Sequence, residues 1–159
     1  MEERIKVLFE VPPGVDDGCR IYKIGMGHAS RQGGPKGDLV AEINVRPHSY
    51  FTRRGKDLHI EVPLTPWEAA LGVEIEIPTL HGAEKLNIPA GTANGEEARL
   101  SEKGVPLLNE GKKGDEVITF RIDLPPGLDE KTKAILAELK RTSPLDLRSG
   151  LGWRLKRSE

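Results

Sequence analysis

The sequence has a single cysteine, few aromatic residues and no long apolar run. Cys19 has no second cysteine with which to form a disulfide or a cysteine-based zinc cluster within this chain. Aromatic residues make up 4% of the chain, which indicates a thin core. The apolar runs fall far short of the roughly 18 residues that span a bilayer, and the N-terminus begins with acids where a secretion signal has bases. We therefore predict a cytoplasmic protein without a membrane partner.

The chain also lacks an excess of either charge. Its 159 residues include 24 basic and 25 acidic side chains, a formal net charge of −1, which argues against a nucleic-acid partner. The Arg53-Arg54 pair is interpreted as solvated surface. The four histidines lie far apart, without cysteine or carboxylate at ligand spacing, so we predict no metal site and no cofactor.

What the chain does have is turns and alternation. It contains 18 glycines and 12 prolines, well above the roughly 12% combined share of average proteins. Between the Gly- and Pro-rich turns, apolar residues recur with a period of two, which is typical of half-buried strands. The predicted strands cover residues 5–11, 39–45, 58–62, 73–77 and 118–122. The pattern predicts a mostly β protein with mainly antiparallel strands.

Two short helices are predicted. Thr65, Pro66 and Glu68 form a capping box with proline at the first helical position, so a helix begins there and ends near Gly72. Its apolar face is expected to hold Trp67, Ala70 and Leu71. A second helix is predicted from an Asp129 cap to about Arg141, with a narrow apolar stripe. Residues 143–159 are predicted to be a flexible tail.

An internal repeat relates the two parts of the chain. A shift of 77 positions lays Pro12, Gly14, Gly18, Gly27, Gly34, Lys36, Gly37, Asp38 and Val40 on Pro89, Gly91, Gly95, Gly104, Gly111, Lys113, Gly114, Asp115 and Val117 without a gap. The apolar faces of the predicted strands agree under the same shift. The chain therefore contains two copies of one β unit.

The second copy opens with a strand, helix and strand block, residues 51–80, that has no counterpart in the first copy. We therefore expect residues 1–46 to be the second half of a first β-sandwich, and 47–126 to be a complete second one. Residues 127–142 would form the terminal helix. The first copy should then have an unpaired strand edge at residues 5–9, which a preceding part of a longer protein or another chain would cover.

Seven short motifs occur in register along the chain: VPPGVDDG at 11–18, GPKGDL at 34–39, RPH at 46–48, FTRRGKDL at 51–58, AALG at 69–72, IPTLHG at 77–82 and KGVP at 103–106. Over residues 5–141 they closely resemble the C-terminal region of DnaJ-type co-chaperones, which carry a J-domain. The resemblance implies two tandem small β-sandwich domains of the DnaJ C-terminal type, the first one N-terminally truncated, plus a C-terminal dimerisation helix. It also implies a homodimer that binds unfolded polypeptide clients and delivers them to a DnaK-type chaperone.

The chain departs from that family in two ways. It has no His-Pro-Asp motif and no Gly/Phe-rich linker, so a DnaK-type ATPase would be recruited through a J-domain absent from this chain. It also has no Cys-x-x-Cys-x-Gly-x-Gly repeats, and whether the whole protein carries a zinc module stays open.

Clients are expected to add to a sheet edge and place alternate apolar side chains in shallow pockets. In the second copy the candidate residues are Val73, Ile75, Ile77, Leu58 and Ile60. In the first copy they are Phe9, Ile21 and Ile24. For each of these residues the alternative is a plain core position.

The apolar stripe of the terminal helix comprises Ile135, Leu136 and Leu139, and Leu128 can contribute. We expect this stripe to meet its symmetry mate in a dimer, and the alternative is docking on the chain's own sandwich. The chain is predicted to have no enzymatic activity. A purely structural oligomerisation module remains an alternative, and so does a β-sandwich hydrolase that uses Asp16 and Asp17, although turns favour both aspartates for backbone reasons.

Overall fold

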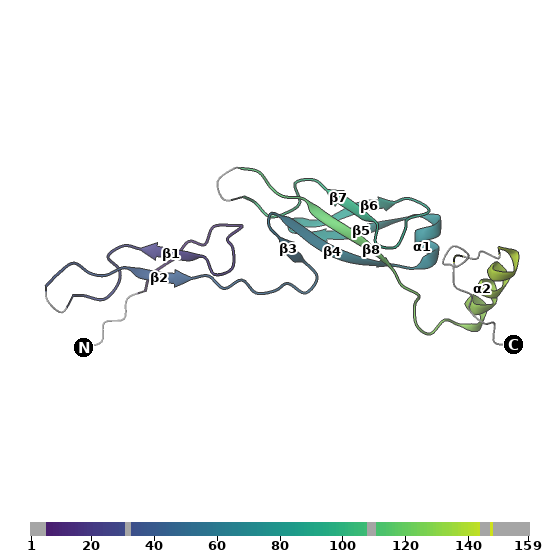
Figure 1. Ribbon diagram of the computed structural model, residues 1–159, viewed down its shortest axis with the longest axis horizontal. Coiled ribbons are helices and arrows are strands. Elements are labelled where there is room, and N and C mark those ends of the chain that lie inside the picture. Colours follow the sequence, from purple (N-terminus) through teal and green to yellow (C-terminus); the bar gives the residue numbers. More distant parts are fainter. Residues whose placement is uncertain (1–5, 31–32, 108–110, 144–146, 148–159) are drawn as a thin grey trace. The chain divides into compact units, whose positions relative to one another are not determined.

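The computed structural model describes residues 6–30, 33–107, 111–143 and 147 (Figure 1). The chain divides into two compact units, residues 1–123 and 124–159. The first unit contains β1 (Arg20–Lys23), β2 (Leu39–Glu42), β3 (Thr52–Arg54), β4 (Asp57–Leu64), α1 (Pro66–Leu71), β5 (Val73–Thr79), β6 (Gly82–Ile88), β7 (Glu97–Leu100) and β8 (Glu116–Ile122), and the second contains α2 (Glu130–Thr142). The mostly β fold is confirmed.

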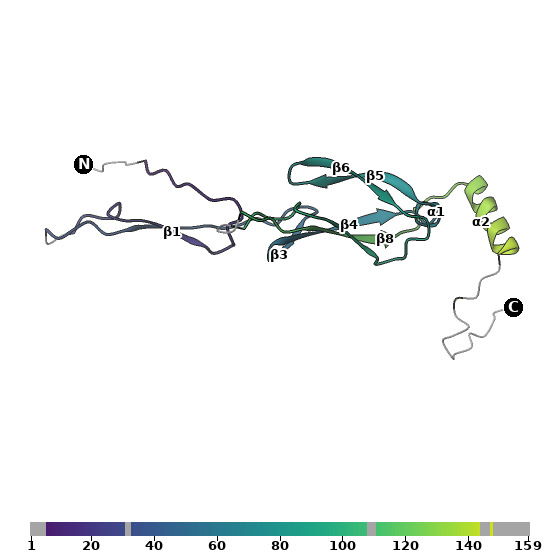
Figure 2. The same cartoon turned by 90° about the horizontal axis from the view of Figure 1, so that it is seen from above.

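The second copy is a sandwich of two sheets. Four strands pair in the order β3-β4-β8-β7, and β5 pairs with β6 in a second layer (Figure 2). The alternating apolar residues of both layers point between them and form one core, as expected for sheets packed face to face. The buried members of this core are Phe51, Leu58, Ile60, Leu64, Ile77, Ile88, Val105, Ile118 and Phe120.

One strand pair departs from the antiparallel expectation. β4 and β8 run parallel, with Leu58 opposite Glu116 and Leu64 opposite Ile122, whereas the other four strand pairs among the described residues are antiparallel. Alternation in sequence shows which residues share a face but not the direction of a neighbour. In the strand order β3-β4-β8-β7, β8 lies inside the sheet, between the parallel β4 and the antiparallel β7.

The first copy contributes the two-stranded sheet of β1 and β2, in which Ile21 lies opposite Ala41. The predicted strand at residues 5–11 is wrong over its described part, because residues 6–11 form no strand. The equivalent strand in the second copy, β6, is held by its pairing with β5, whereas among the described residues no strand pairs with residues 6–11. A strand without a neighbour has no ladder of hydrogen bonds to hold it.

The hydrogen bonds of the turns repeat at the same offset of 77. Gly18 N–H donates to the Ile43 carbonyl at 2.8 Å, and its counterpart Gly95 donates to Phe120 at 2.7 Å. Three more donor–acceptor pairs recur in this way: Ile43 to Cys19 and Phe120 to Glu96, Gly27 to Gly37 and Gly104 to Gly114, and Gly37 to His28 and Gly114 to Val105. The sequence repeat is therefore also a repeat of backbone geometry.

Helix α1 begins as its capping box predicts. The Thr65 hydroxyl accepts from the Glu68 N–H, and the Glu68 carboxylate accepts from the Thr65 N–H at 2.8 Å. The Thr65 hydroxyl also donates to the same carboxylate at 2.6 Å, and this bond, together with the one from the Thr65 N–H, holds the pKa of Glu68 below its ordinary value. The predicted apolar face was wrong, since Ala69 is the buried residue while Trp67 and Leu71 are exposed. In a helix this short, packing against the turn after β6, where Gly91 and Thr92 donate to the Ala69 carbonyl, decides which face is buried.

Helix α2 has 13 residues and begins where the sequence predicts. The Asp129 carboxylate accepts from the Thr132 N–H at 2.8 Å. Hydrogen bonding to the Thr132 side chain, and then to its N–H, holds the pKa of Asp129 below its ordinary value. Ion pairs Lys133–Glu130 and Arg141–Glu138 lie along its surface. The predicted flexible tail lies outside the described residues, apart from Ser143 and Leu147.

Candidate functional sites

The open edge of β5 is the first candidate site. Among the described residues β5 pairs with β6 alone, so one row of its backbone groups has no partner strand. Thr79 and Gly82 close a two-residue turn, which makes them a hydrogen-bonded pair and directs every second residue from Thr79 back to Val73 toward β6. The N–H and C=O groups of Glu74 and Glu76 therefore face the open edge.

Pro78 supports the same assignment of which residues of β5 direct their backbone groups toward the open edge. Proline has no N–H and is tolerated within a strand where its nitrogen faces away from the ladder. Pro78 lies two residues after Glu76, so it belongs to the row that faces the open edge. The edge thus offers two N–H donors, at Glu74 and Glu76, and ends at a residue that can only accept.

The predicted client-binding residues of the second copy lie on the inner side of this sandwich. Leu58, Ile60 and Ile77 are buried in the core, in keeping with the alternative of plain core positions. Val73 and Ile75 are partly buried and pack against that core from β5. The structure therefore places only Val73 and Ile75, of this group, where an added strand could reach the side chain.

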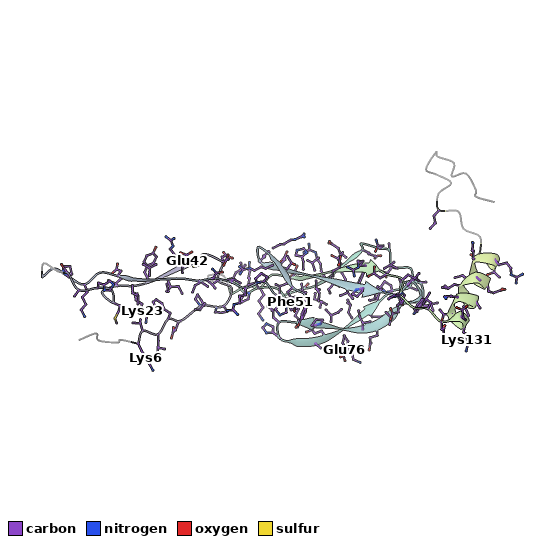
Figure 3. All side chains as sticks on the ribbon, turned by 90° about the horizontal axis from the view of Figure 1, so that it is seen from below. Lys6, Lys23, Glu42, Phe51, Glu76 and Lys131 are labelled. Carbon is purple, nitrogen blue, oxygen red and sulfur yellow. The ribbon has the colours of Figure 1, made fainter. Side chains whose placement is uncertain are left out.

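The outer face of the β5–β6 sheet is charged. Glu74 pairs with Lys85 at 3.0 Å across the two strands. Glu76 is exposed and lies on the side of the sheet that faces away from the core (Figure 3). A strand added at this edge would meet Glu74 and Glu76 on one face and the margin of the core on the other.

None of the three candidate residues of the first copy is buried. Phe9 and Ile21 are half-buried, and Ile24 is 86% exposed in the segment just after β1. The Lys23 ammonium lies 5.6 Å from the centre of the Phe9 ring, a cation–π distance. The structure thus brings Phe9 close to the end of β1, although residues 6–11 form no strand.

The apolar stripe of α2 is the second candidate site. Ile135 and Leu139 are 61% and 58% exposed, and Leu136 and Leu128 are half-buried. None of the residues of α2 is buried. A helix of about 13 residues is marginally stable in water by itself, so this stripe is suited to a partner surface.

The candidate carboxylates for hydrolysis have structural partners. Asp16 forms an ion pair with Arg53 at 2.6 Å, and Asp17 accepts from the Val45 N–H at 2.7 Å. Within the described ranges no group of three or more His, Cys, Asp or Glu side chains could hold a metal ion. In the same part of the chain no helix is both long and apolar enough to cross a membrane.

A buried acid that sequence reasoning missed lies on β8. Glu116 is fully buried, and neither of its carboxylate oxygens has a hydrogen-bond partner among the described residues. Burial is the main cause that raises its pKa to about 7, and Glu84 raises it further, whereas Lys103, which pairs with Glu84, lowers it. A signal was available, because the 77-residue shift lays Glu116 on the apolar Leu39.

Comparison with known proteins agrees with this geometry. Residues 1–125 match the family model of the DnaJ C-terminal domain. The chain is 47% identical over 142 residues to the Chaperone protein DnaJ of Caldicellulosiruptor bescii, covering 89% of this chain and 36% of that protein. It is 42% identical over 150 residues to the Chaperone protein DnaJ of a Geobacillus species, covering 94% and 40%.

The chain thus spans well under half the length of these curated relatives. The family match extends over most of the chain and includes both copies of the repeat and the sandwich with its open edge. The resemblance seen in the seven motifs is therefore confirmed, and the chain belongs to the DnaJ C-terminal domain family, whose β-rich fold it has.

Proposed function

We propose that this chain binds non-native polypeptide at the open edge of β5 and forms a homodimer through α2. The one-sided pairing of β5 carries the first part, because free N–H and C=O groups can bind an extended chain without reading its sequence. The partly buried Val73 and Ile75 would supply apolar contacts beside the edge. The activity is binding rather than catalysis, and a cytoplasmic setting stays a prediction.

The exposed stripe of α2 supports the second part. Each contact of a client with one edge is expected to be weak, with a dissociation constant of the order of micromolar. A dimer presents two such edges, and the second contact then forms at the high effective concentration set by the first. Dimerisation would therefore raise the avidity for long unfolded chains that cover both edges.

A proline at position 76 tests the edge. Glu76→Pro removes one outward N–H while leaving the hydrogen bonds between β5 and β6 in place, since those involve the alternate residues. We expect the concentration needed to suppress aggregation of a denatured client to rise about fivefold, as for the loss of one hydrogen bond of about 1 kcal/mol. Light scattering of the client measures this.

Glu76→Gln is the matched control, because it removes the same charge and keeps the N–H. It should suppress aggregation as the unaltered chain does, and circular dichroism should show the same β content for both variants. Equal activity of Glu76→Pro and the control would exclude this edge. Absence of suppression by the unaltered dimer would instead favour a purely structural oligomerisation module.

We further propose that a DnaK-type ATPase receives the client through a J-domain elsewhere in the full-length protein. This chain added alone to a DnaK-type chaperone should leave ATP turnover at its basal rate, since it contains no His-Pro-Asp motif. Steady-state phosphate release measures that rate. A clear acceleration would contradict the proposal and place a stimulating surface in this chain.

A further inference from the structure

Arg53, in the middle of β3, binds backbone of the first copy. Its Nη1 donates to the Val15 carbonyl at 2.8 Å, and its Nη2 donates to the Gly14 carbonyl at 3.0 Å. Nη2 also pairs with the Asp16 carboxylate at 2.6 Å. The Nε donates to the Gly55 carbonyl at 2.8 Å, in the turn that follows β3. One guanidinium therefore joins the turn of residues 12–18 to the second copy.

The backbones of the two copies also touch at this point. Gly14 has φ +87°, and a Cβ built on it would lie 2.1 Å from the carbonyl oxygen of Pro106 in the second copy. No side chain fits at that distance. The turn of the first copy is therefore packed directly against residues 105–106.

Comparing the two copies distinguishes the backbone conformation that the turn requires from the crowding that the contact causes. Gly91 is the equivalent of Gly14 and has nearly the same φ, +88°, yet a Cβ there would meet nothing within 4 Å. The positive φ is thus a property of the turn in both copies. The crowding occurs at Gly14 alone of these two, so it reflects contact with the second copy.

We propose that Arg53 is a positioning residue that holds the two copies at a fixed angle. A planar guanidinium suits this role because it can donate to several fixed acceptors at once, whereas an ammonium acts as a point charge. The neighbouring Arg54 is exposed, and its side chain belongs to the outer surface of β3. The consequence for clients rests on the proposed function: a fixed angle keeps the open edge of β5 in one direction relative to the candidate residues Phe9, Ile21 and Ile24 of the first copy.

Distances between spin labels test the joint directly. Labels at Glu42→Cys on β2 and Glu76→Cys on β5, two exposed positions, report on the two copies (Figure 3). The labelled protein is the whole 159-residue chain with Cys19→Ser. Dilution with unlabelled chain removes the distances between labels on the two protomers of a dimer. We expect a single narrow distance peak for the parent chain and for Arg54→Gln, and at least a twofold wider distribution for Arg53→Gln and Arg53→Lys.

Amide exchange of β4 and β8 should stay unchanged in all these variants, which a merely structural role of Arg53 in the sandwich would not allow. Gly14→Ala provides a second route, since it pushes the turn away without altering β3, and should widen the distribution as well. If the distance distributions of Arg53→Gln and Gly14→Ala are as narrow as that of the parent chain, the proposed positioning role of Arg53 is wrong. A parent chain that binds no client would contradict the proposed function, but the distance measurements would still test the role of Arg53.

Discussion

Replacing Glu116 with glutamine is expected to stabilise the second copy by about 2–3 kcal/mol at pH 8, because the carboxylate is ionised there without hydrogen-bond partners among the described residues. The side chain is fully buried between Leu58 of β4 and Leu100 of β7, its register neighbours in the sheet. Glu84 adds a like charge, and the Lys103 that could offset it is paired with Glu84. Removing the charge therefore removes a cost.

The sign of the pH dependence follows from the direction of the shift. The pKa of Glu116 is about 7 in the folded chain and near 4.5 when unfolded, so the folded state holds the proton more tightly. The stability it contributes is fully present below pH 4.5 and is lost as the pH rises toward 7. The free energy of unfolding of the unaltered chain should thus fall between pH 5 and pH 8. In Glu116→Gln this fall should largely disappear.

Urea unfolding followed by circular dichroism at pH 5, 6, 7 and 8 gives these free energies. Glu74→Gln is the control, since Glu74 is exposed on β5, and its removal should leave both the free energy and its pH dependence unchanged. Glu116→Leu, which restores the residue type of Leu39, should be at least as stable as Glu116→Gln because it also removes the buried polar atoms. A parent chain with the same free energy of unfolding at pH 5 and pH 8 would contradict the raised pKa of the buried Glu116 carboxylate.

Placing charge on the α2 stripe is expected to convert a dimer into a monomer. Leu136→Asp with Leu139→Asp puts two carboxylates where the helix would meet its symmetry mate, and burying an unpaired charge costs far more than one helix pair can supply. The mass from light scattering during gel filtration should fall to that of one chain. The Asp129 cap, which holds the first turn, is left intact.

The control carries the same charges on the opposite face of the helix. Ala134→Asp with Ala137→Asp introduces two carboxylates at exposed positions away from the stripe and lowers helix propensity at least as much. It should remain dimeric. A dimer that survives Leu136→Asp with Leu139→Asp would exclude α2 as the interface, and a parent chain that is monomeric would favour docking of the stripe on its own sandwich.

The sequence carried enough information for most of the fold. Both helix starts were predicted because Thr65 with Glu68 and Asp129 are local capping signals. The repeat was predicted because its turns need glycine at fixed positions, and the hydrogen bonds confirm it. The parallel pairing of β4 with β8 was not, since strand direction is a property of the chain's path.

The sites were harder to derive from sequence for a physical reason. Arg53 and Arg54 are adjacent and chemically identical, and the interpretation of both as solvated surface is wrong for Arg53, which only its contacts with residues 14–16 distinguish from Arg54. An alternating pattern likewise gives the same weight to Ile77, which is fully buried, and to Ile75 at the margin of the core. Whether a residue serves the core or an edge depends on which strands are neighbours, and that is set over the whole chain.

The central position of β8 determines when the strands of this sheet can pair during synthesis. Residues 116–122 are among the last of the first unit to leave the ribosome, yet they fill the gap between β4 and β7. Until then β4 lacks the neighbour that lies 58 positions later in the chain, as Leu58 and Glu116 show, and loop closure over such a span slows folding. During synthesis the nascent second copy is therefore itself an unfinished chain with exposed strands, in the same condition as the non-native polypeptides that we propose it binds.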